Sequence, residues 1–514
     1  MINDVNAAVR YHYFWRMEEY MFRGEDLRVE DVLTIRNKRF SLDKTIWQNI
    51  ATNRQALENL LSDDNARYYG INTGFGALYS VKIPHDKVSQ LQTNLLRSHA
   101  CGTGPAAPPA IVRLTLLLKI ISLSYARSGV RPEVVRGLLD LLNHDILPVL
   151  PTMGSLGASG DLAPLAHLCL PLIGEGEVVY RREQMPAARA LALAGLSPLD
   201  LAAKEGLALI NGTQYSLAWL VYAIGHARQI AQVADICAAM SMDGYDAHPA
   251  FLDKAIHEVR RQHGQICAAA HIRQWLEGST ILHGSKTHLQ DPYSFRCAPQ
   301  VHGASRDAID YVTSIANREI NAVTDNPLVI EDEEGVRIVS GGNFHAQPLA
   351  LSSDFLAIAL SEYGSISERR SYLMLNGQRN LPFALANDPG LESGMMICQY
   401  TAAALVNRNK GLCYPASVDT IVTSGGQEDH VSMAANAGIK LFEVVNNTWK
   451  LLAIEWLIAC QALEYRRPLT TSPQLEVLHA RYRTKVAPLT GDREYASDFE
   501  VTDQFLRSMN IEMS

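Results

Sequence analysis

Residues 443–467 read EVVNNTWKLLAIEWLIACQALEYRR, a long and mostly apolar run that stops just before Pro468. A helix with apolar residues on most sides belongs inside a bundle or at a contact between subunits. Proline removes a backbone donor and clashes with the preceding turn, so we expect Pro468 to end the helix. This stretch therefore predicts a fold built on long buried helices.

Other segments extend the helical pattern. Residues 132–147, PEVVRGLLDLLNHDIL, begin with a proline that suits a first helical turn, and their apolar residues recur at steps of three and four. Residues 348–378 and 395–410 are similar. Strand candidates are few, at 178–183 (VVYRRE) and 336–342 (VRIVSGG). Because strands and helices do not alternate regularly, we expect a mainly α fold and not a doubly wound sheet.

The organisation of the chain changes near residue 215. Glycines and prolines punctuate the sequence before this point, and long helical patterns prevail after it. We predict an N-terminal extension at 1–24, a smaller mixed domain at 25–215 and a helical bundle domain at 216–514. The extension lacks the apolar core and small-residue cleavage site of a secretory signal.

Composition excludes several classes of partner. The 514 residues are 47% hydrophobic and 19% charged, which suits a soluble protein with a large core. A net charge of −8 argues against the basic face that nucleic-acid binding requires. The most apolar candidate for a membrane span, residues 111–126, contains Arg113 and Lys119, and such charges are costly in hydrocarbon. We therefore expect neither a nucleic-acid partner nor a membrane span.

The cysteines and histidines indicate compartment and metal content. The eight cysteines form no CxxC pair, and some, such as Cys169, lie in apolar runs. This pattern is typical of buried free thiols in a reducing cytoplasm. The 16 histidines contain no HExxH and no close His/Cys/Asp set, so no metal site is expected.

The unusual loop of the chain is GSLGASGD, residues 154–161. No Lys follows it as a phosphate-binding loop requires, and its glycine spacing is not the dinucleotide fingerprint. Pro148 and Pro151 also argue against the preceding strand that this fingerprint needs. Asp161 stands where a nucleophile elbow needs glycine.

A fourth reading is a reaction of the backbone with itself. Glycine lacks Cβ, so the nitrogen of Gly160 can approach the carbonyl carbon of Ala158 and close a five-membered ring. Loss of one water from this adduct and of a second from Ser159 leaves an imidazolone with an exocyclic methylene, which is a strong electrophile. A helix after Asp161 would direct its positive end at the ring.

Motifs around this loop carry a resemblance to a known family. The chain resembles the ammonia-lyases that use 4-methylideneimidazole-5-one (MIO), most closely their histidine-deaminating members. The motifs stand in the family's order over about residues 65–470: YYGINTGFG (68–76), NLLRSHACGTG (94–104), GSLGASGDLAPLAH (154–167), ALINGTQ (208–214), QDPYSFRCAPQVHG (290–303), NREINAVTDNPLV (317–329), SGGNFHAQPLALSSD (340–354) and PASVDTIVTSGGQEDHVSM (415–433).

The resemblance implies roles for residues around the MIO formed by Ala158, Ser159 and Gly160. Tyr69 becomes the base that removes the β-proton; a free tyrosine has a pKa of about 10, so it needs nearby cations or donors. Arg296 binds the substrate carboxylate in a bidentate fork.

Further implied roles complete the ring site. Gln290 and Tyr293, three residues apart, share a helical face or line one loop and contact the ring or the substrate amine. Asn211 holds the ring carbonyl and can stabilise negative charge there. Phe344 packs over the loop and helps ring closure.

Two residues indicate the substrate. His99 in RSHACG is implied to line the side-chain pocket, and Glu428 in QEDH to pair with the imidazole or the ammonium of the substrate. The chain departs from the family pattern at Gln347, where Glu is more usual, and at Gly425-Gly426.

The resemblance thus implies a mainly α ammonia-lyase of the fumarase/aspartase-like superfold, acting in histidine catabolism. It converts L-histidine to trans-urocanate and ammonia, needs no external cofactor, and forms a homotetramer with active sites shared between subunits. A tyrosine or phenylalanine ammonia-lyase and an MIO-dependent aminomutase remain alternatives. A ring-free enzyme of the fumarase type lacks support because its GSxxMPxKxNP loop is not found.

Overall fold

The computed structural model describes residues 18–63, 66–74 and 81–509. Contacts divide the chain into two compact units. The first comprises Met1–Tyr222, Ser314–Ser353 and Pro415–Ile439; the second comprises Ala223–Thr313, Asp354–Tyr414 and Lys440–Ser514. Each unit is therefore assembled from segments far apart in the sequence. The contiguous domains proposed from the sequence, with a boundary at 215, stay a prediction.

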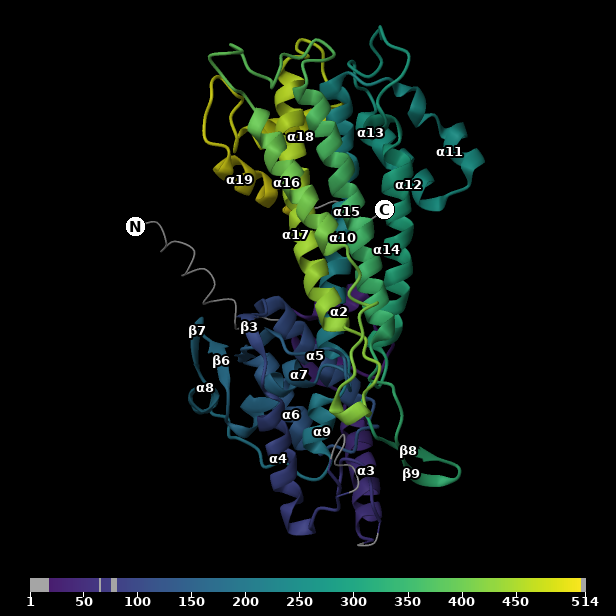
Figure 1. The fold of residues 1–514 in the computed structure, drawn as a ribbon, viewed down its shortest axis with the longest axis vertical. Coiled ribbons are helices and arrows are strands. Elements are labelled where there is room, and N and C mark those ends of the chain that lie inside the picture. Colours follow the sequence, from purple (N-terminus) through teal and green to yellow (C-terminus); the bar gives the residue numbers. More distant parts are fainter. Residues whose placement is uncertain (1–17, 64–65, 75–80, 510–514) are drawn as a thin grey trace. The chain divides into compact units, whose positions relative to one another are not determined.

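The first unit combines short helices with small sheets (Figure 1). Its helices are α2 (Val29–Ile35), α3 (Lys44–Leu61), α4 (Val88–His99), α5 (Pro109–Ser124), α6 (Pro132–Asn143), α7 (Leu162–Cys169), α8 (Ala187–Ala194) and α9 (Glu205–Ile210). From Ile111 to Ser124, every residue of α5 except Arg113 is buried, so this helix forms the centre of the unit.

The strands of the first unit are short. Parallel β1 (Glu19–Phe22) and β2 (Arg39–Leu42) pair with each other, and β3 (Thr103–Ala106) pairs antiparallel with β5 (Pro151–Met153). A three-stranded sheet orders β4 (Leu147–Pro148), β6 (Glu177–Tyr180) and β7 (Glu183–Pro186), and β8 (Leu328–Asp332) forms a hairpin with β9 (Gly335–Val339). Residues 1–17 of the predicted extension lie outside the described residues, whereas β1 makes its end part of the fold.

The second unit is helical. Its elements are the C-terminal part of α10 (Gln214–Tyr245), α11 (Lys254–Arg260), α12 (His263–Leu276), α13 (Tyr293–Arg296), most of α14 (Ala298–Ile320), most of α15 (Gln347–Leu375), α16 (Met396–Leu412), most of α17 (Ala434–Glu464), α18 (Pro473–Arg483) and α19 (Ala496–Arg507). The long helices run side by side (Figure 1), and buried polar bonds join them, as between Ser241 of α10 and Glu455 of α17. The mainly α fold expected from the sequence is confirmed.

Element boundaries differ in detail from those expected. The helix expected at 443–467 is α17, which begins at Ala434 and already ends at Glu464. The segment 178–183 is not one strand, because β6 ends at Tyr180 and Arg181 and Arg182 form the turn into β7 with φ of +52° and +67°. The segment 336–342 contributes β9.

The expectation that Pro148 and Pro151 exclude strands is wrong. Both prolines lie in strands, β4 and β5, of two and three residues. Each strand stands at the edge of its sheet and pairs on one side only. A proline is tolerated there because its missing N–H is not needed for a second partner.

The cysteines are unpaired, and the helices can be compared with the length and apolarity of a membrane span. All eight cysteines are free; Cys169, Cys237, Cys398 and Cys460 are buried as expected, whereas Cys101 and Cys267 are exposed. Within the described ranges, no helix combines the length and apolarity needed to cross a membrane.

Candidate active site

The turn at Ala158-Ser159-Gly160 is compressed. Ser159 has a φ of +53° and Gly160 a φ of +82°. The nitrogen of Gly160 donates to the carbonyl of Gly157 over a long 3.3 Å. A positive φ is uncommon for a residue with a side chain and is stored strain that the surrounding structure must hold in place.

Only glycine fits at position 160. The nitrogen of Asp161 donates to the carbonyl oxygen of Gly212 at 2.8 Å, which brings the 210–213 segment against the turn. A Cβ on Gly160 would lie 2.2 Å from that same oxygen, closer than real Cβ atoms approach. Residue 160 must therefore lack a side chain, which is also what a ring-forming nitrogen at this position requires.

Asp161 joins the turn to Ser155 in the preceding loop and to Ser216 near the start of α10. Its buried carboxylate accepts hydrogen bonds from Ser155 Oγ at 3.2 Å, and from the nitrogen and Oγ of Ser216 at 2.7 Å each. Burial raises the pKa of Asp161 to about 6, and the Ser216 and Ser155 bonds oppose this rise. The helix expected after Asp161 is present as α7, so a positive helix end lies next to the turn.

Asn211 lies at the C-terminal end of α9, one residue before Gly212. Its side chain is buried, and its Oδ1 has no hydrogen-bond partner among the described residues. A buried amide oxygen without a partner is costly unless a further group completes it. The compressed turn, the glycine-only contact and this amide together fit a ring formed by residues 158–160.

The loop that carries Tyr69 is held at several points. Asn72 Oδ1 accepts from the nitrogen of Tyr68 at 2.7 Å, and Gln92 Nε2 donates to the carbonyl of Gly70 at 3.3 Å. Ile71 is fully buried in a cluster with Leu57 and Val329. Tyr69 itself is half-buried on an anchored loop; the motif's last two residues, 75–76, lie outside the described residues.

His99 and Glu428 lie within electrostatic range of each other. Burial lowers the pKa of His99, the last residue of α4, and the hydrogen bond to the Leu95 carbonyl and then the nearby Glu428 carboxylate oppose this shift. His99 Nδ1 lies 2.9 Å from the carbonyl of Leu95, which assigns the proton to Nδ1 and leaves Nε2 as an acceptor. Glu428 Oε2 accepts from Ser424 Oγ at 2.9 Å. This pair offers an acceptor and an anion to an imidazole.

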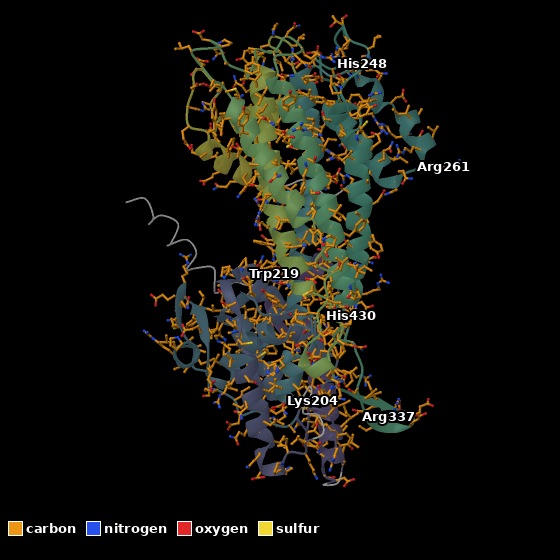
Figure 2. The ribbon with its side chains drawn as sticks, in the orientation of Figure 1. Lys204, Trp219, His248, Arg261, Arg337 and His430 are labelled. Carbon is orange, nitrogen blue, oxygen red and sulfur yellow. The ribbon has the colours of Figure 1, made fainter. Side chains whose placement is uncertain are left out.

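Gln290, Tyr293 and Arg296 lie together in the second unit, in an open pocket of about 640 Å³. His248, labelled in Figure 2, also lines it. The helix α13 begins at Tyr293, so Gln290 lies in the loop before it and the two residues line one pocket. The Arg296 guanidinium lies 4.8 Å from the centre of the Tyr293 ring.

Polar atoms of this pocket are available to a ligand. Arg296 Nε is buried and has no hydrogen-bond partner in the described part of the chain. Asp291 holds the loop, because its carboxylate accepts from the nitrogen of His248 at 2.6 Å and from Arg379 at 3.1 Å. A guanidinium placed in this way can bind a carboxylate.

The candidate residues thus divide between the units. The first holds Tyr69, His99, Ala158, Ser159, Gly160, Asn211, Glu428 and Phe344, which is half-buried in the loop before α15; the second holds Gln290, Tyr293 and Arg296. Gln347, where the family more usually has Glu, uses its amide nitrogen to donate to the carbonyl of Ser417 at 3.3 Å.

Sequence reasoning missed two buried polar residues beside these, Gln92 and Lys119. The sequence does contain a signal for Lys119, because a charged residue stands out in the apolar run 111–126. This charge was used only as an argument against a membrane span.

Comparison with known proteins adds to this geometry. A family model described as aromatic amino acid lyase matches residues 27–484. A histidine ammonia-lyase of Geobacillus sp. (strain WCH70) is 45% identical over 491 residues, which is 95% of this chain and 96% of that protein. The crystal structure of histidine ammonia-lyase from Trypanosoma cruzi aligns with a TM-score of 0.88 at 38% identity, covering 95% and 93% of the two chains. Pantoea agglomerans phenylalanine aminomutase aligns with a TM-score of 0.90 at 29% identity, covering 95% and 98%.

Proposed function

Because the chain belongs to the aromatic amino acid lyase family, we propose that it acts as a histidine ammonia-lyase, converting L-histidine to trans-urocanate and ammonia. It is a carbon–nitrogen lyase. The compressed turn at residues 158–160, in which only glycine fits at 160, is the observation that carries this proposal. The Glu428 carboxylate lies close enough to His99 to act on its pKa, and this proximity supports histidine as the substrate.

The turn is the source of the prosthetic group. Ala158, Ser159 and Gly160 form MIO, and the amide of Asn211 and the backbone of Gly212 hold it. When formed, MIO would supply an electrophile for the lone pair of the substrate amine, which makes the amine a better leaving group. Phe344 covers the turn.

The side chains of the chain do the remaining work. Tyr69, on its anchored loop, accepts the β-proton of the substrate. Arg296 binds the carboxylate through its fork, and Gln290 and Tyr293 position the amine. His99 Nε2 accepts from the substrate imidazole, which fixes its orientation before the proton is removed.

Assembly completes the site. We propose a homotetramer whose active sites combine residues of several subunits. An exposed apolar stripe on α15, formed by Leu351, Phe355 and Ile358 at steps of four and three, supports a helical interface. Tyr293 is 70% exposed, so its pocket has room for a neighbouring chain. Eight free cysteines are consistent with the cytoplasmic location proposed for it.

A side-by-side assay tests the proposal. Purified protein is incubated with L-histidine, L-tyrosine and L-phenylalanine, and the products are separated and identified. Urocanate from histidine is expected, with little turnover of the other two. Brisk turnover of tyrosine, or a β-amino acid product, would assign the chain to a tyrosine enzyme or to an aminomutase like that of Pantoea agglomerans.

The prosthetic group is tested separately by intact-mass measurement. The wild-type chain is expected to weigh two water molecules less than its translated sequence. Ser159→Ala, which removes the leaving hydroxyl, should keep the fold, lose part of this deficit and lose activity. A wild-type chain of full translated mass contradicts the proposal.

A further inference from the structure

Lys119 is a charged residue buried at the centre of the first unit. It lies in α5, is 1% exposed, and is surrounded by apolar residues along the helix. Its ammonium donates to the carbonyl oxygen of Asn211 at 2.8 Å. That carbonyl belongs to the peptide joining Asn211 to Gly212, the residue whose backbone lies against Gly160. The ammonium is therefore one peptide group away from the reactive turn.

Nearby carboxylates favour the protonated form of Lys119, although that of Asp325 already has another lysine as its partner. Burial lowers its pKa to about 8, and the carboxylates of Asp325 and Asp161 oppose this shift, whereas Lys204 and burial favour loss of the proton. Lys204, labelled in Figure 2, already pairs with Asp325 at 2.6 Å. Cys169 is the remaining titratable neighbour, and burial raises its pKa to about 12, so it stays neutral. Asp325 thus has its own partner, and the Lys119 ammonium remains directed at Asn211.

Stability alone does not explain this residue. An ammonium taken out of water is costly, and well-packed apolar residues in place of buried charges are often neutral or stabilising. The ammonium does have a chemical use here. A peptide whose carbonyl accepts from a cation becomes a stronger donor at its own N–H, and a fixed charge in a water-excluded site stabilises negative charge that develops nearby.

We propose that Lys119 is a positioning residue for the lyase reaction: it holds and polarises the Asn211–Gly212 peptide against the 158–160 turn. This role rests on the proposed function, since it concerns charge that develops on the group formed there. Lys119 acts through the peptide and does not touch the substrate.

The test compares Lys119→Met with a matched control, Lys204→Met. Both substitutions remove one fully buried ammonium from the same unit, but only Lys119 contacts Asn211. kcat and KM for L-histidine are measured per chain that carries the two-water mass deficit, and thermal midpoints are recorded. Lys119→Met is expected to lower kcat about 10- to 100-fold, less than the 10²–10³ lost with a direct oxyanion donor, and to leave KM within about twofold.

Lys204→Met is expected to lower the thermal midpoint at least as much as Lys119→Met, because it leaves Asp325 unpaired, while kcat stays within about threefold. Equal losses of kcat in the two variants would overturn the proposal, since any buried charge would then suffice. An absent mass deficit in Lys119→Met would overturn it too, because Lys119 would then act on ring formation.

Lys119→Gln provides a second, polar variant in case the methionine variant does not fold. It lacks the charge and is expected to show the same loss of kcat. Wild-type kcat in this variant, or failure of both Lys119 variants to fold, would assign Lys119 a structural role. Wild-type enzyme without histidine turnover would instead refute the proposed function itself.

Discussion

Substitution of Gly160 by alanine probes the feature on which the reactive turn depends. Two separate costs arise from the structure. Alanine at a φ of +82° is in the left-handed region, which costs roughly 1–2 kcal/mol. Its Cβ would also lie 2.2 Å from the carbonyl oxygen of Gly212, so backbone must move, and overpacking of this kind costs about 1–3 kcal/mol. The expected destabilisation is therefore about 2–5 kcal/mol.

Gly195 provides a matched control in the same unit. Its φ is +73°, but a Cβ there meets nothing within 4 Å. Gly195→Ala thus carries the conformational cost alone, about 1–2 kcal/mol. The difference between the two variants isolates the contact between residues 160 and 212.

Urea unfolding followed by circular dichroism measures both variants at one protein concentration, because a chain of 514 residues with two compact units need not unfold in two states. Gly160→Ala is expected to unfold at a clearly lower urea midpoint than Gly195→Ala. Its mass deficit should be absent, because the displaced nitrogen no longer reaches the carbonyl of Ala158. Equal midpoints and a retained deficit would refute the reasoning.

Three other substitutions test the remaining features. Arg296→Lys keeps the charge but loses the fork and the stacking on Tyr293, so KM for L-histidine should rise about tenfold or more in steady-state assays; an unchanged KM would contradict the assigned role. Glu428→Gln removes a charged acceptor worth about 1.5–3 kcal/mol, so kcat/KM for histidine should fall roughly 10- to 100-fold, and a loss below twofold would count against the pairing. Burial raises the pKa of Asp243 to about 7 from its ordinary 3.8, so its favourable contribution is complete below pH 3.8 and is lost as pH rises through 7. Asp243→Asn should therefore unfold at higher urea than wild type at pH 8 and at a similar midpoint near pH 4; a larger gain at pH 4 would reverse the sign.

Local patterns in the sequence predicted much of the secondary structure. The apolar spacing of 443–467 and 132–147 located α17 and α6, and the scarcity of alternating segments predicted the mainly α fold. The ends were less accurate, because the signals that end a helix or strand depend on its partners. Pro148 and Pro151 illustrate this, since a proline is compatible with a strand only at an edge that no sequence window reveals.

The sequence by itself also determined the chemistry available at residues 158–160, because Ala, Ser and Gly supply the carbonyl, the leaving hydroxyl and the unhindered nitrogen in consecutive positions. Only the tertiary structure decided that Gly212 presses on Gly160, that Glu428 lies near His99, and that the Lys119 ammonium reaches the carbonyl of Asn211, 92 positions away. The physical reason is that the periodicity of a segment indicates which of its faces is buried. Contacts between distant segments arise only when these faces pack together. Neither the spacing nor the composition of one segment specifies which other segment it will contact.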